Sequence, residues 1–196
     1  MISAVREDSF VEASAGLPGL TVRKAVMHDI PAILHLINGY AAKGIMLPRT
    51  EFELSEAIRD FTVVLLDNEF LGCGALHFYS PTIAEIRSLA VHEHAKTHGV
   101  GRRVVEALVK EAQDYELDAV FAFTYVVDFF KRVGFHDVER GVLPLKAWKD
   151  CLRCPKFQAC DEIAVLLILN PDRWHAAQLS SPDDQFIQLP IPSAAR

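Results

Sequence analysis

A pair of glycines stands in the middle of the chain, in the segment Lys96-Thr97-His98-Gly99-Val100-Gly101. The flanking residues predict a strand before this segment and a helix after it. Glycines let the backbone approach a ligand closely, and the start of a helix offers unpaired N–H groups and the positive end of a dipole. With positive charge from Lys96, Arg102 and Arg103, these features would suit a pyrophosphate group. A Gly-x-Gly pair taken alone more often serves only a tight turn.

Two familiar phosphate-binding motifs do not fit this loop. A P-loop requires Gly-Lys-Ser/Thr after a four-residue spacer, and the segment does not contain it. A dinucleotide-binding fold requires a third glycine at a fixed spacing, where this chain has Val104. The ligand of the loop therefore has to be inferred from its wider context.

A cluster of cysteines is the second feature that could do chemistry. Cys151-x-x-Cys154 and then Cys160 have the close spacing of a metal knuckle. Three thiolates lack a fourth ligand unless Asp161 or His136 supplies it, and the sequence shows no second Cys or His pair. We therefore expect no bound metal and a knuckle of buried or free thiols, with zinc as the weaker alternative.

Composition excludes several classes of protein. The 196 residues are 51% hydrophobic and 23% charged, which is typical of a globular domain. The net charge of −6 argues against a general nucleic-acid binder, whose phosphate contacts need a basic field. No apolar run approaches the roughly 20 residues that span a bilayer, and the charged segment 1–19 is unlike a secretory signal. We expect a cytoplasmic protein that binds neither nucleic acid nor membrane.

The elements that must position the glycine loop follow from the hydropathy pattern. We expect Asp29 to cap the first helix, Gly44 to stop it, and Gly134 to end the last helix. Strands are predicted at 21–25, 62–66, 70–78, 83–91, 118–124 and 162–169, and helices at about 30–41, 53–61, 101–115 and 127–133.

This order of elements predicts a single domain of the α+β or α/β class around a mixed sheet, over residues 20–169. Residues 1–19 have no period and predict a flexible leader. Proline and polar residues predict a C-terminal tail over 170–196.

The glycine loop resembles the acetyl-CoA-binding motif of the GNAT superfamily of N-acetyltransferases, Gln/Arg-x-x-Gly-x-Gly/Ala, with Lys96 in place of Gln or Arg. The preceding Ser88-Leu89-Ala90-Val91 resembles that superfamily's fourth strand, whose backbone holds pantetheine, and the stretch from Phe129 to Phe135 resembles its aromatic-x-x-x-Gly-Phe signature. The resemblance covers roughly residues 20–169 and implies the acyl-CoA N-acyltransferase fold of the α+β class. That fold has three α/β layers, with a mixed, mostly antiparallel central sheet flanked by helices. The acetyl-CoA-binding residues it implies are Leu89, Ala90, Val91, Lys96, Thr97, His98, Gly99, Val100, Gly101, Arg102, Phe129 and Phe130.

Further stretches resemble the acetyltransferase domain of amino-acid N-acetyltransferases, the N-acetylglutamate synthases of arginine biosynthesis. These stretches are Met46 to Arg49, Gly72 to His77, Ala84 to Val91, Phe121 to Tyr125 and Leu143-Pro144-x-Lys146-x-Trp148. The resemblance implies acetyl transfer to the α-amino group of L-glutamate, with L-glutamine as an alternative acceptor. Longer members carry a kinase-like domain ahead of this one. The 196 residues do not include such a domain, and we expect the short form.

A general base must deprotonate the ammonium group of such an acceptor before acetyl transfer. Glu85 matches the family's glutamate and is the candidate base. From the residues alone, an ordinary ion pair between Glu85 and Arg87 or Arg132 would be the simpler interpretation. The backbone N–H of Leu89 or a neighbour would hold the oxyanion of the tetrahedral intermediate.

The usual general acid of the superfamily is missing, because Phe130 stands where many members have a tyrosine. In the glutamate-acetylating branch a hydroxyl falls at the end of the preceding strand, and Thr124 occupies that place here. Tyr125 is a second candidate. A threonine is a weak acid, so Thr124 would hydrogen-bond the sulfur or orient a water.

Three cations in family-matching stretches are candidates for binding the carboxylates of a dicarboxylic amino acid. They are Arg49, Arg87 and Lys146, and Ser88 could add a hydrogen bond. Surface solvation is the alternative for each cation, and for Lys146 it has equal weight.

Two other functions stay open at this level. A different amine could be the acceptor, although a polyamine site should be lined by acidic residues rather than by Arg49 and Arg87. The chain could also be a non-catalytic acetyl-CoA sensor, an interpretation motivated by Phe130. The partners implied are acetyl-CoA and an amino acid, and a homodimer is an open alternative to a monomer.

Overall fold

The structure is a computed structural model of the 196-residue chain, and it describes residues 18–139, 143, 156 and 160–179. The strands are β1 (Leu20–Lys24), β2 (Phe61–Leu66), β3 (Glu69–Phe78), β4 (Ile83–Val91), β5 (Ala119–Thr124), β6 (His136–Val138) and β7 (Ile163–Ile168). The helices are α1 (Ile30–Ala41), α2 (Glu51–Ala57), α3 (Val100–Asp114), α4 (Val127–Arg132) and α6 (Pro171–Leu179), with 3₁₀ turns η1 (Met27–Asp29), η2 (Ile58–Asp60) and η3 (Glu93–His98). Within the described ranges, no helix is long and apolar enough to cross a membrane.

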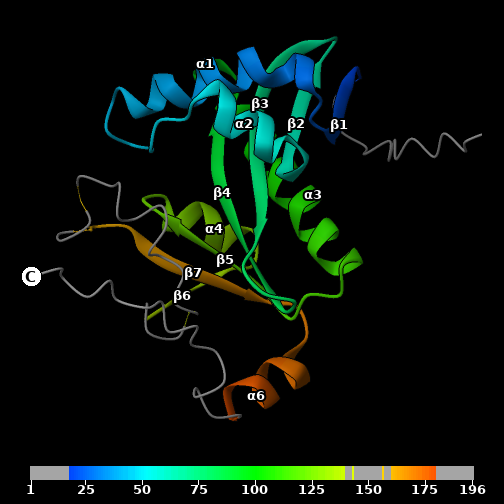
Figure 1. Cartoon of the computed structure of the whole chain (residues 1–196), viewed down its shortest axis with the longest axis vertical. Helices are drawn as coiled ribbons and strands as arrows, with labels where there is room; N and C mark the ends of the chain where they lie inside the picture. The colour runs from blue at the N-terminus through cyan, green and yellow to red at the C-terminus, as the bar shows by residue number, and fades with distance from the viewer. Residues whose placement is uncertain (1–17, 140–142, 144–155, 157–159, 180–196) are drawn as a thin grey trace, which may run out of the picture.

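The seven strands form one sheet in the order β1-β2-β3-β4-β5-β7-β6 (Figure 1). All neighbours pair antiparallel except β4 and β5, which run parallel. This confirms the predicted mixed, mostly antiparallel sheet. The parallel pairing covers only three residue pairs and ends at Glu85 opposite Phe121. The C-terminal half of β4 is therefore not paired with β5.

Side chains alternate between two faces of the sheet, as they must in strands. Val64 on β2 and Val104 on α3 belong to one apolar cluster, whereas the neighbouring Val63 packs in a second cluster with Ile33 on α1 and Leu54 on α2. Figure 1 shows α3 on one side of the sheet and α1 with α2 on the other. The three predicted layers are confirmed.

Local sequence explains where several elements begin and turn. Asp67 and Asn68 have φ values of 48° and 69°, which gives the two-residue hairpin turn between β2 and β3 that such residues favour. Thr50 and Glu53 form a capping box, in which the Thr50 hydroxyl accepts from the backbone N–H of Glu53 at 3.2 Å. The box starts α2 at Glu51 rather than at the predicted position 53.

The second helix is also shorter than the pattern predicted. It was expected to run to residue 61, but α2 ends at Ala57, η2 follows, and Phe61 is the first residue of β2. Phe61 is buried and pairs with Ala75 of β3. Sheet pairing therefore outweighed the helical spacing of its apolar neighbours.

The first part of the segment predicted as a C-terminal tail forms the helix α6, which lies below the sheet (Figure 1). Asn170 caps this helix by accepting from the backbone N–H of Arg173 at 3.1 Å, and Pro171 occupies the first helical position. Arg173 forms an ion pair with the buried Asp118 at 2.6 Å, which holds α6 beside the start of β5. The dipeptide Asn-Pro was the local signal for this helix.

Asp29 stands at the N-cap position of α1, but its carboxylate does not cap that helix. It accepts instead from the backbone N–H of Val26 at 2.7 Å and from both guanidinium nitrogens of Arg23 at 2.7 and 2.9 Å. Burial by itself would raise the pKa of Asp29, but the hydrogen bonds from Arg23 and Val26 outweigh it and lower the pKa. The ion pair joins β1 to α1.

The lowered pKa predicts how stability depends on pH. Ionised Asp29 stabilises the fold above its unfolded-state pKa of about 3.8, and this contribution is lost as the pH falls through the lower folded-state value. Asp29→Asn should lower the free energy of unfolding at pH 7 by about 1–3 kcal/mol, the range for a hydrogen bond to a charged group. Urea unfolding at pH 7, 5 and 3 should show the difference from wild type shrinking below about pH 4. A difference that stays constant with pH would contradict this account.

Two glycines of β3 allow close packing on both of its sides. A Cβ at Gly72 would lie 2.7 Å from the carbonyl oxygen of Ala90, and a Cβ at Gly74 would lie 2.7 Å from Cγ1 of Val104. Gly72 thus lets β3 approach β4, and Gly74 lets α3 lie directly on β3. A larger residue would require a shift of the backbone at Gly72 and a shift of the Val104 side chain at Gly74.

We predict that Gly72→Ala lowers the free energy of unfolding by about 1–3 kcal/mol, since the new methyl group meets backbone rather than a flexible side chain. The matched control is Gly39→Ala within α1, where a Cβ would meet nothing within 4 Å. That variant should be stabilised by up to about 1 kcal/mol through its helix propensity. Chemical denaturation measures both, and equal effects would refute the packing argument.

Candidate active site

A β-bulge in β4 shapes the strand at the point where β5 leaves it. The register with β3 passes from Arg87 opposite Ala75 to Ala90 opposite Cys73, so Ser88 and Leu89 together face one residue. Ser88 has a φ of 53°, in the left-handed region that non-glycine residues rarely adopt. Strain at this position is typical of functional sites.

The thiol of Cys73 lies behind the bulge and donates a long hydrogen bond of 3.8 Å to the carbonyl of Ser88. Complete burial raises the pKa of Cys73 to about 12. The thiol is therefore neutral at physiological pH. Its place indicates support for the bulge, because a nucleophilic cysteine needs a lowered pKa and access.

Glu85 is buried, with 4% of its surface exposed, at the last residue pair that joins β4 to β5. The hydroxyl of Tyr79 donates to its Oε2 at 3.0 Å, and His77 lies opposite it on β3. Before the bulge the side chains of β4 alternate, so Arg87 leaves the strand on the same face as Glu85. Of the predicted residues, the structure thus brings Glu85, Arg87 and Ser88 to one short stretch beside the strand separation.

The predicted glycine loop between β4 and α3 contains the 3₁₀ turn η3, and Gly99 joins this turn to α3. Gly99 has a φ of 72° and occupies the N-cap position of α3, with no side chain bonded to the cap. The first-turn N–H groups of this 15-residue helix therefore point out of its end without a side-chain cap. A Cβ at Gly101 would lie 3.4 Å from the ring of Phe129, so α4 closes over the start of α3.

The positive side chains near this loop are held by acidic neighbours. Nζ of Lys96 lies 3.0 Å from Glu93, and this hydrogen bond is the main reason that the pKa of Lys96 is raised. Arg102 binds Glu106 one turn further along α3 at 2.7 Å. Val100 is buried at the helix start, whereas His98 is exposed. Thr97 lies in η3.

Thr124 is buried at the end of β5, where its hydroxyl oxygen accepts from the backbone N–H of Val126 at 3.0 Å. This bond forms the turn into α4 and leaves the hydroxyl proton available for donation. Side chains alternate along a strand, so the Thr124 side chain lies on the same face of the sheet as Val120. The Glu85 side chain on β4 lies on the opposite face. The two candidate catalytic residues thus border the strand separation from different faces.

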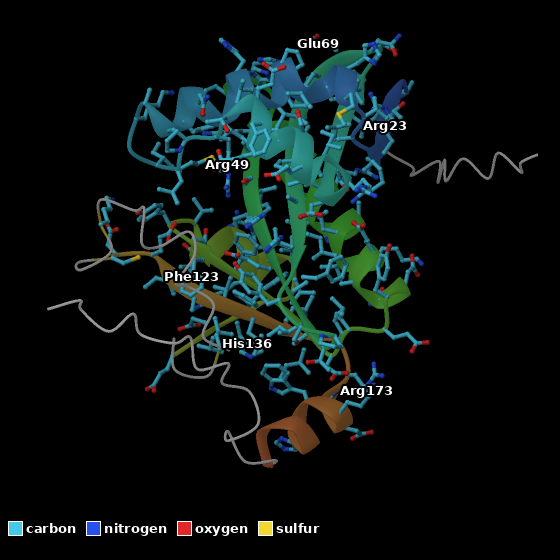
Figure 2. The ribbon with its side chains drawn as sticks, in the orientation of Figure 1. Arg23, Arg49, Glu69, Phe123, His136 and Arg173 are labelled. Carbon is cyan, nitrogen blue, oxygen red and sulfur yellow. The ribbon has the colours of Figure 1, made fainter. Side chains whose placement is uncertain are left out.

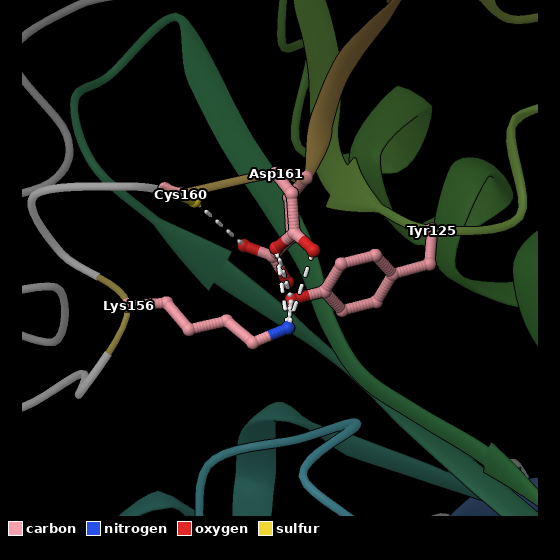
Figure 3. Close-up of polar contacts among 5 residues, drawn as sticks. Tyr125, Lys156, Cys160 and Asp161 are labelled. Carbon is pink, nitrogen blue, oxygen red and sulfur yellow. Dashed lines mark hydrogen bonds and ion pairs between the residues drawn. The ribbon is translucent and has the colours of Figure 1, made fainter.

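Tyr125 belongs to a cluster of polar side chains shown in Figure 3. Its hydroxyl donates to Asp161 at 3.0 Å and accepts from Nζ of Lys156 at 3.1 Å, and that ammonium group lies 4.8 Å from the Tyr125 ring centroid. Partial burial and the bond to Asp161 raise the pKa of Tyr125, although Lys156 opposes them. The Tyr125 hydroxyl is therefore protonated at neutral pH.

Phe130, which stands in place of the usual tyrosine, is part of the core. It is 3% exposed and makes edge-to-face contacts with Phe129 at 5.3 Å and Phe135 at 5.1 Å between ring centroids. Gly134 follows α4 with a φ of 95°, as expected of a helix end. Phe130 anchors α4 against the sheet and has no group that could donate a proton.

The candidate substrate cations lie on separate elements. Arg49 belongs to the loop before α2, and the Asn38 amide fixes that loop by accepting from the Arg49 N–H at 2.9 Å and donating to its carbonyl at 3.0 Å. Figure 2 shows Arg49 below α1 and α2. Lys146 lies outside the described residues. Asn38 was missed at the sequence level, because one polar residue in an amphipathic helix is no signal.

Cys151 and Cys154 also lie outside the described residues, so the structure does not test the knuckle that they would form. Cys160 is partly buried, and its thiol lies 3.8 Å from Oε2 of Glu162 (Figure 3). Among the residues that the structure describes, no group of three His, Cys, Asp or Glu side chains could hold a metal ion.

Residues 34–135, slightly more than half of the chain, match the acetyltransferase (GNAT) family. The match contains Glu85, the bulge and the glycine loop. The chain belongs to this family. Its cosubstrate is acetyl-CoA, and its reaction is acetyl transfer. The uncapped start of α3 and the left-handed Gly99 fit the pyrophosphate of that cosubstrate.

Three relatives show which proteins within the family this chain is similar to. An uncharacterised N-acetyltransferase of Chlorobaculum tepidum is 43% identical over 148 residues, covering 76% of this chain and 96% of that protein. An amino-acid acetyltransferase of Mycobacterium tuberculosis is 39% identical over 121 residues, covering 60% and 69% respectively. An amino-acid acetyltransferase of Pasteurella multocida is 32% identical, but the match covers 64% of this chain and only 29% of that protein.

Solved structures agree with this GNAT assignment. A protein of Mycobacterium tuberculosis in complex with CoA and NLQ has a TM-score of 0.67 at 30% identity, covering 76% of this chain and 99% of that one. The N-acetylglutamate synthase of Neisseria gonorrhoeae, complexed with CoA and N-acetyl-glutamate, has a TM-score of 0.67 at 26% identity, covering 77% and 35%. The predicted fold and the resemblance to amino-acid N-acetyltransferases are confirmed. The roles assigned to individual residues stay predictions.

Gly99 offers a test of the pyrophosphate site with a matched control. Gly99 and Gly44 have φ values of 72° and 71°, and a Cβ at either position would meet nothing within 4 Å. Alanine at either position should therefore lower stability by a similar amount, about 1–2 kcal/mol. Gly99→Ala should also weaken acetyl-CoA binding about tenfold, or about 1.4 kcal/mol, by disturbing the start of α3. Calorimetric titration measures this, and equal acetyl-CoA affinities of the two variants would rule out the assignment.

Proposed function

We propose that this GNAT enzyme acetylates the α-amino group of L-glutamate, with L-glutamine as the alternative acceptor. The observation that carries the proposal is the pair Glu85 and Arg87, which places a buried carboxylate and a cation on one face of β4 where β5 separates from it. Two of the relatives are named amino-acid acetyltransferase. The product would be N-acetylglutamate, a compound of arginine biosynthesis, made in the cytoplasm.

Glu85 would act as the general base. The acceptor ammonium group gives one proton to the carboxylate, directly or through a water, and becomes a nucleophilic amine. The amine nitrogen then bonds to the thioester carbonyl carbon, the C–S bond breaks, and the CoA sulfur leaves with the electron pair. A second proton from the nitrogen, passed to the sulfur, completes the reaction as amide and CoA thiol.

The bulge would supply the oxyanion hole. Ser88 and Leu89 bulge out of the regular register, and the Leu89 N–H is the proposed donor to the developing oxyanion. Ala90 and Val91 continue the strand toward the glycine loop and would hold pantetheine through their backbone. Tyr125, protonated at neutral pH, would be a better proton donor to the sulfur than Thr124. Thr124 would hydrogen-bond the sulfur or a water.

Arg49 and Arg87 would bind the carboxylates of the acceptor, each through a planar guanidinium suited to bidentate contact. Asn38 gives the backbone at Arg49 a fixed position, which such recognition requires. Lys146 and Ser88 are the further contacts proposed from the family resemblance. Positively charged side chains at the acceptor site would favour an anionic amino acid over a polyamine.

One observation favours a second candidate, an acetyl-CoA sensor without turnover. Phe130 fills the core where many family members place a proton donor. A panel assay separates the two functions. The purified protein is incubated with acetyl-CoA and each of glutamate, glutamine, other amino acids, a polyamine and a peptide, and products are identified by mass spectrometry. Acetylation of glutamate or glutamine supports the proposal, whereas binding of acetyl-CoA without any product supports the sensor.

Glu85→Gln should lower kcat by about 10²–10⁴-fold, the usual loss of a general base, with little change in acetyl-CoA affinity. Glu56→Gln, an exposed residue of α2, is the matched control and should leave kcat unchanged. The pH–rate profile decides the role. If Glu85→Gln keeps the wild-type profile, Glu85 is not the base.

A further inference from the structure

Near the turn between β3 and β4, three side chains contact one another in a series that ends at Glu85. The proposed reaction gives none of these three a role. Tyr79 bonds Glu85, His77 contacts Tyr79, and Asp60 bonds His77. We propose that Tyr79 is the positioning residue of the catalytic base and that His77 with Asp60 fixes Tyr79 in place. The inference rests on the proposed role of Glu85.

The hairpin itself puts the Tyr79 hydroxyl beside the base. Tyr79 follows β3, and its backbone N–H donates to the carbonyl of Ile83 at 3.0 Å, which closes the turn. Its ring lies 5.6 Å from that of Phe121, the residue paired with Glu85 on β5. The hydroxyl then donates to Oε2 of Glu85 at 3.0 Å. The ring is therefore fixed by contacts on both strands that meet at the base.

His77 and Asp60 form the outer part of the chain. Nδ1 of His77 lies 3.1 Å from Oδ2 of Asp60, and because a carboxylate can only accept, this nitrogen carries a proton. The imidazole meets the Tyr79 ring edge-on, with 5.0 Å between centroids and 85° between planes. Asp60 is the last residue of η2 and directly precedes β2, so the position of β2 in the sheet fixes it. A rotation of the Tyr79 ring would break the contact between Tyr79 and His77.

The chemical value of the hydroxyl follows from the burial of Glu85. A buried carboxylate loses its water, and a phenol that donates to one oxygen stabilises the ionised form that must accept a proton. The bond also fixes the orientation of the carboxylate. Among the described residues, the titratable groups near Glu85 are Arg87 on its own face of β4 and His77 opposite it on β3, with Asp60 behind His77, while β5 presents the apolar Phe121. Tyr79 is thus a neutral donor placed between Glu85 and His77.

Tyr79→Phe removes the hydroxyl and keeps the ring. We expect kcat to fall about tenfold, as for one hydrogen bond to a charged group, with an unchanged KM for acetyl-CoA. The acidic limb of the pH–rate profile should move to higher pH by about one unit, since the carboxylate form is less stabilised. Tyr115→Phe is the matched control, because Tyr115 is 63% exposed and packs against Phe78 away from the base. It should change neither quantity.

Variants of His77 and Asp60 should lower kcat less than Tyr79→Phe does. His77→Phe keeps a ring against Tyr79 but loses the bond to Asp60, and Asp60→Asn keeps the shape but removes the charge. Each should lower kcat about threefold, less than Tyr79→Phe, because they act only through Tyr79. Equal or larger losses in these variants would overturn the proposed order of action.

A double-mutant cycle separates positioning from a general effect on folding. If Tyr79 acts through Glu85, then Tyr79→Phe should change the residual rate of Glu85→Gln by less than twofold, whereas a purely structural role would multiply the two losses. The cycle uses whichever amine the wild-type enzyme acetylates, so a different acceptor would refute only the proposed substrate. If no amine is acetylated, the proposed function fails. The carboxyl ¹³C titration of Glu85, assigned with Glu85→Gln, still tests Tyr79, and an unchanged titration in Tyr79→Phe would overturn the inference.

Discussion

The site depends on one limit of the sheet: β4 and β5 pair over only three residues. A backbone N–H or carbonyl that loses its strand partner must find another, because burying it unpaired is unfavourable. The backbone groups of β5 find partners in β7, which pairs with β5 along its whole length to Thr124. β4 pairs with β3 on one side, and beyond Glu85 no strand in the described part of the chain pairs with its other edge. In the proposed site that edge would bind the amide groups of pantetheine, so the interruption that weakens the sheet would provide a binding edge for acetyl-CoA.

The residues around the interruption carry features that a purely structural sheet would avoid. Ser88 adopts a left-handed conformation, which costs about 1–2 kcal/mol for a residue with a Cβ. Glu85 puts a carboxylate into an interior where charge is unfavourable without partners. The surrounding packing tolerates both, because Gly72 and Gly74 let β4 and α3 lie tightly on β3. Stability supplied by this close packing keeps the bulge and Glu85 in place.

Sequence reasoning succeeded where the signal is local. The bounds 83–91 predicted for β4 are those observed, and the glycine loop before α3 was found because its residues are contiguous. The bond between Tyr79 and Glu85 escaped prediction, since it depends on the register of a hairpin and on which way a ring turns. The amide of Asn38 that fixes Arg49 escaped for the same reason. The helix α6 is a different case, because Asn170 and Pro171 carried a capping signal that the polar composition of the segment obscured.

The donor and acceptor halves of the site are attached to different parts of the fold. The glycine loop and α4 lie on the α3 side of the sheet, whereas Arg49 is held by Asn38 on α1, on the opposite side. Glu85 stands between them on the shared strand. If Arg49 binds the acceptor as proposed, a change in its loop would alter which amine is bound without disturbing η3, Gly99 or the bulge. This separation explains why the contiguous acetyl-CoA motif is a clear signal of the family, while the proposed acceptor contacts are dispersed over β4 and one loop.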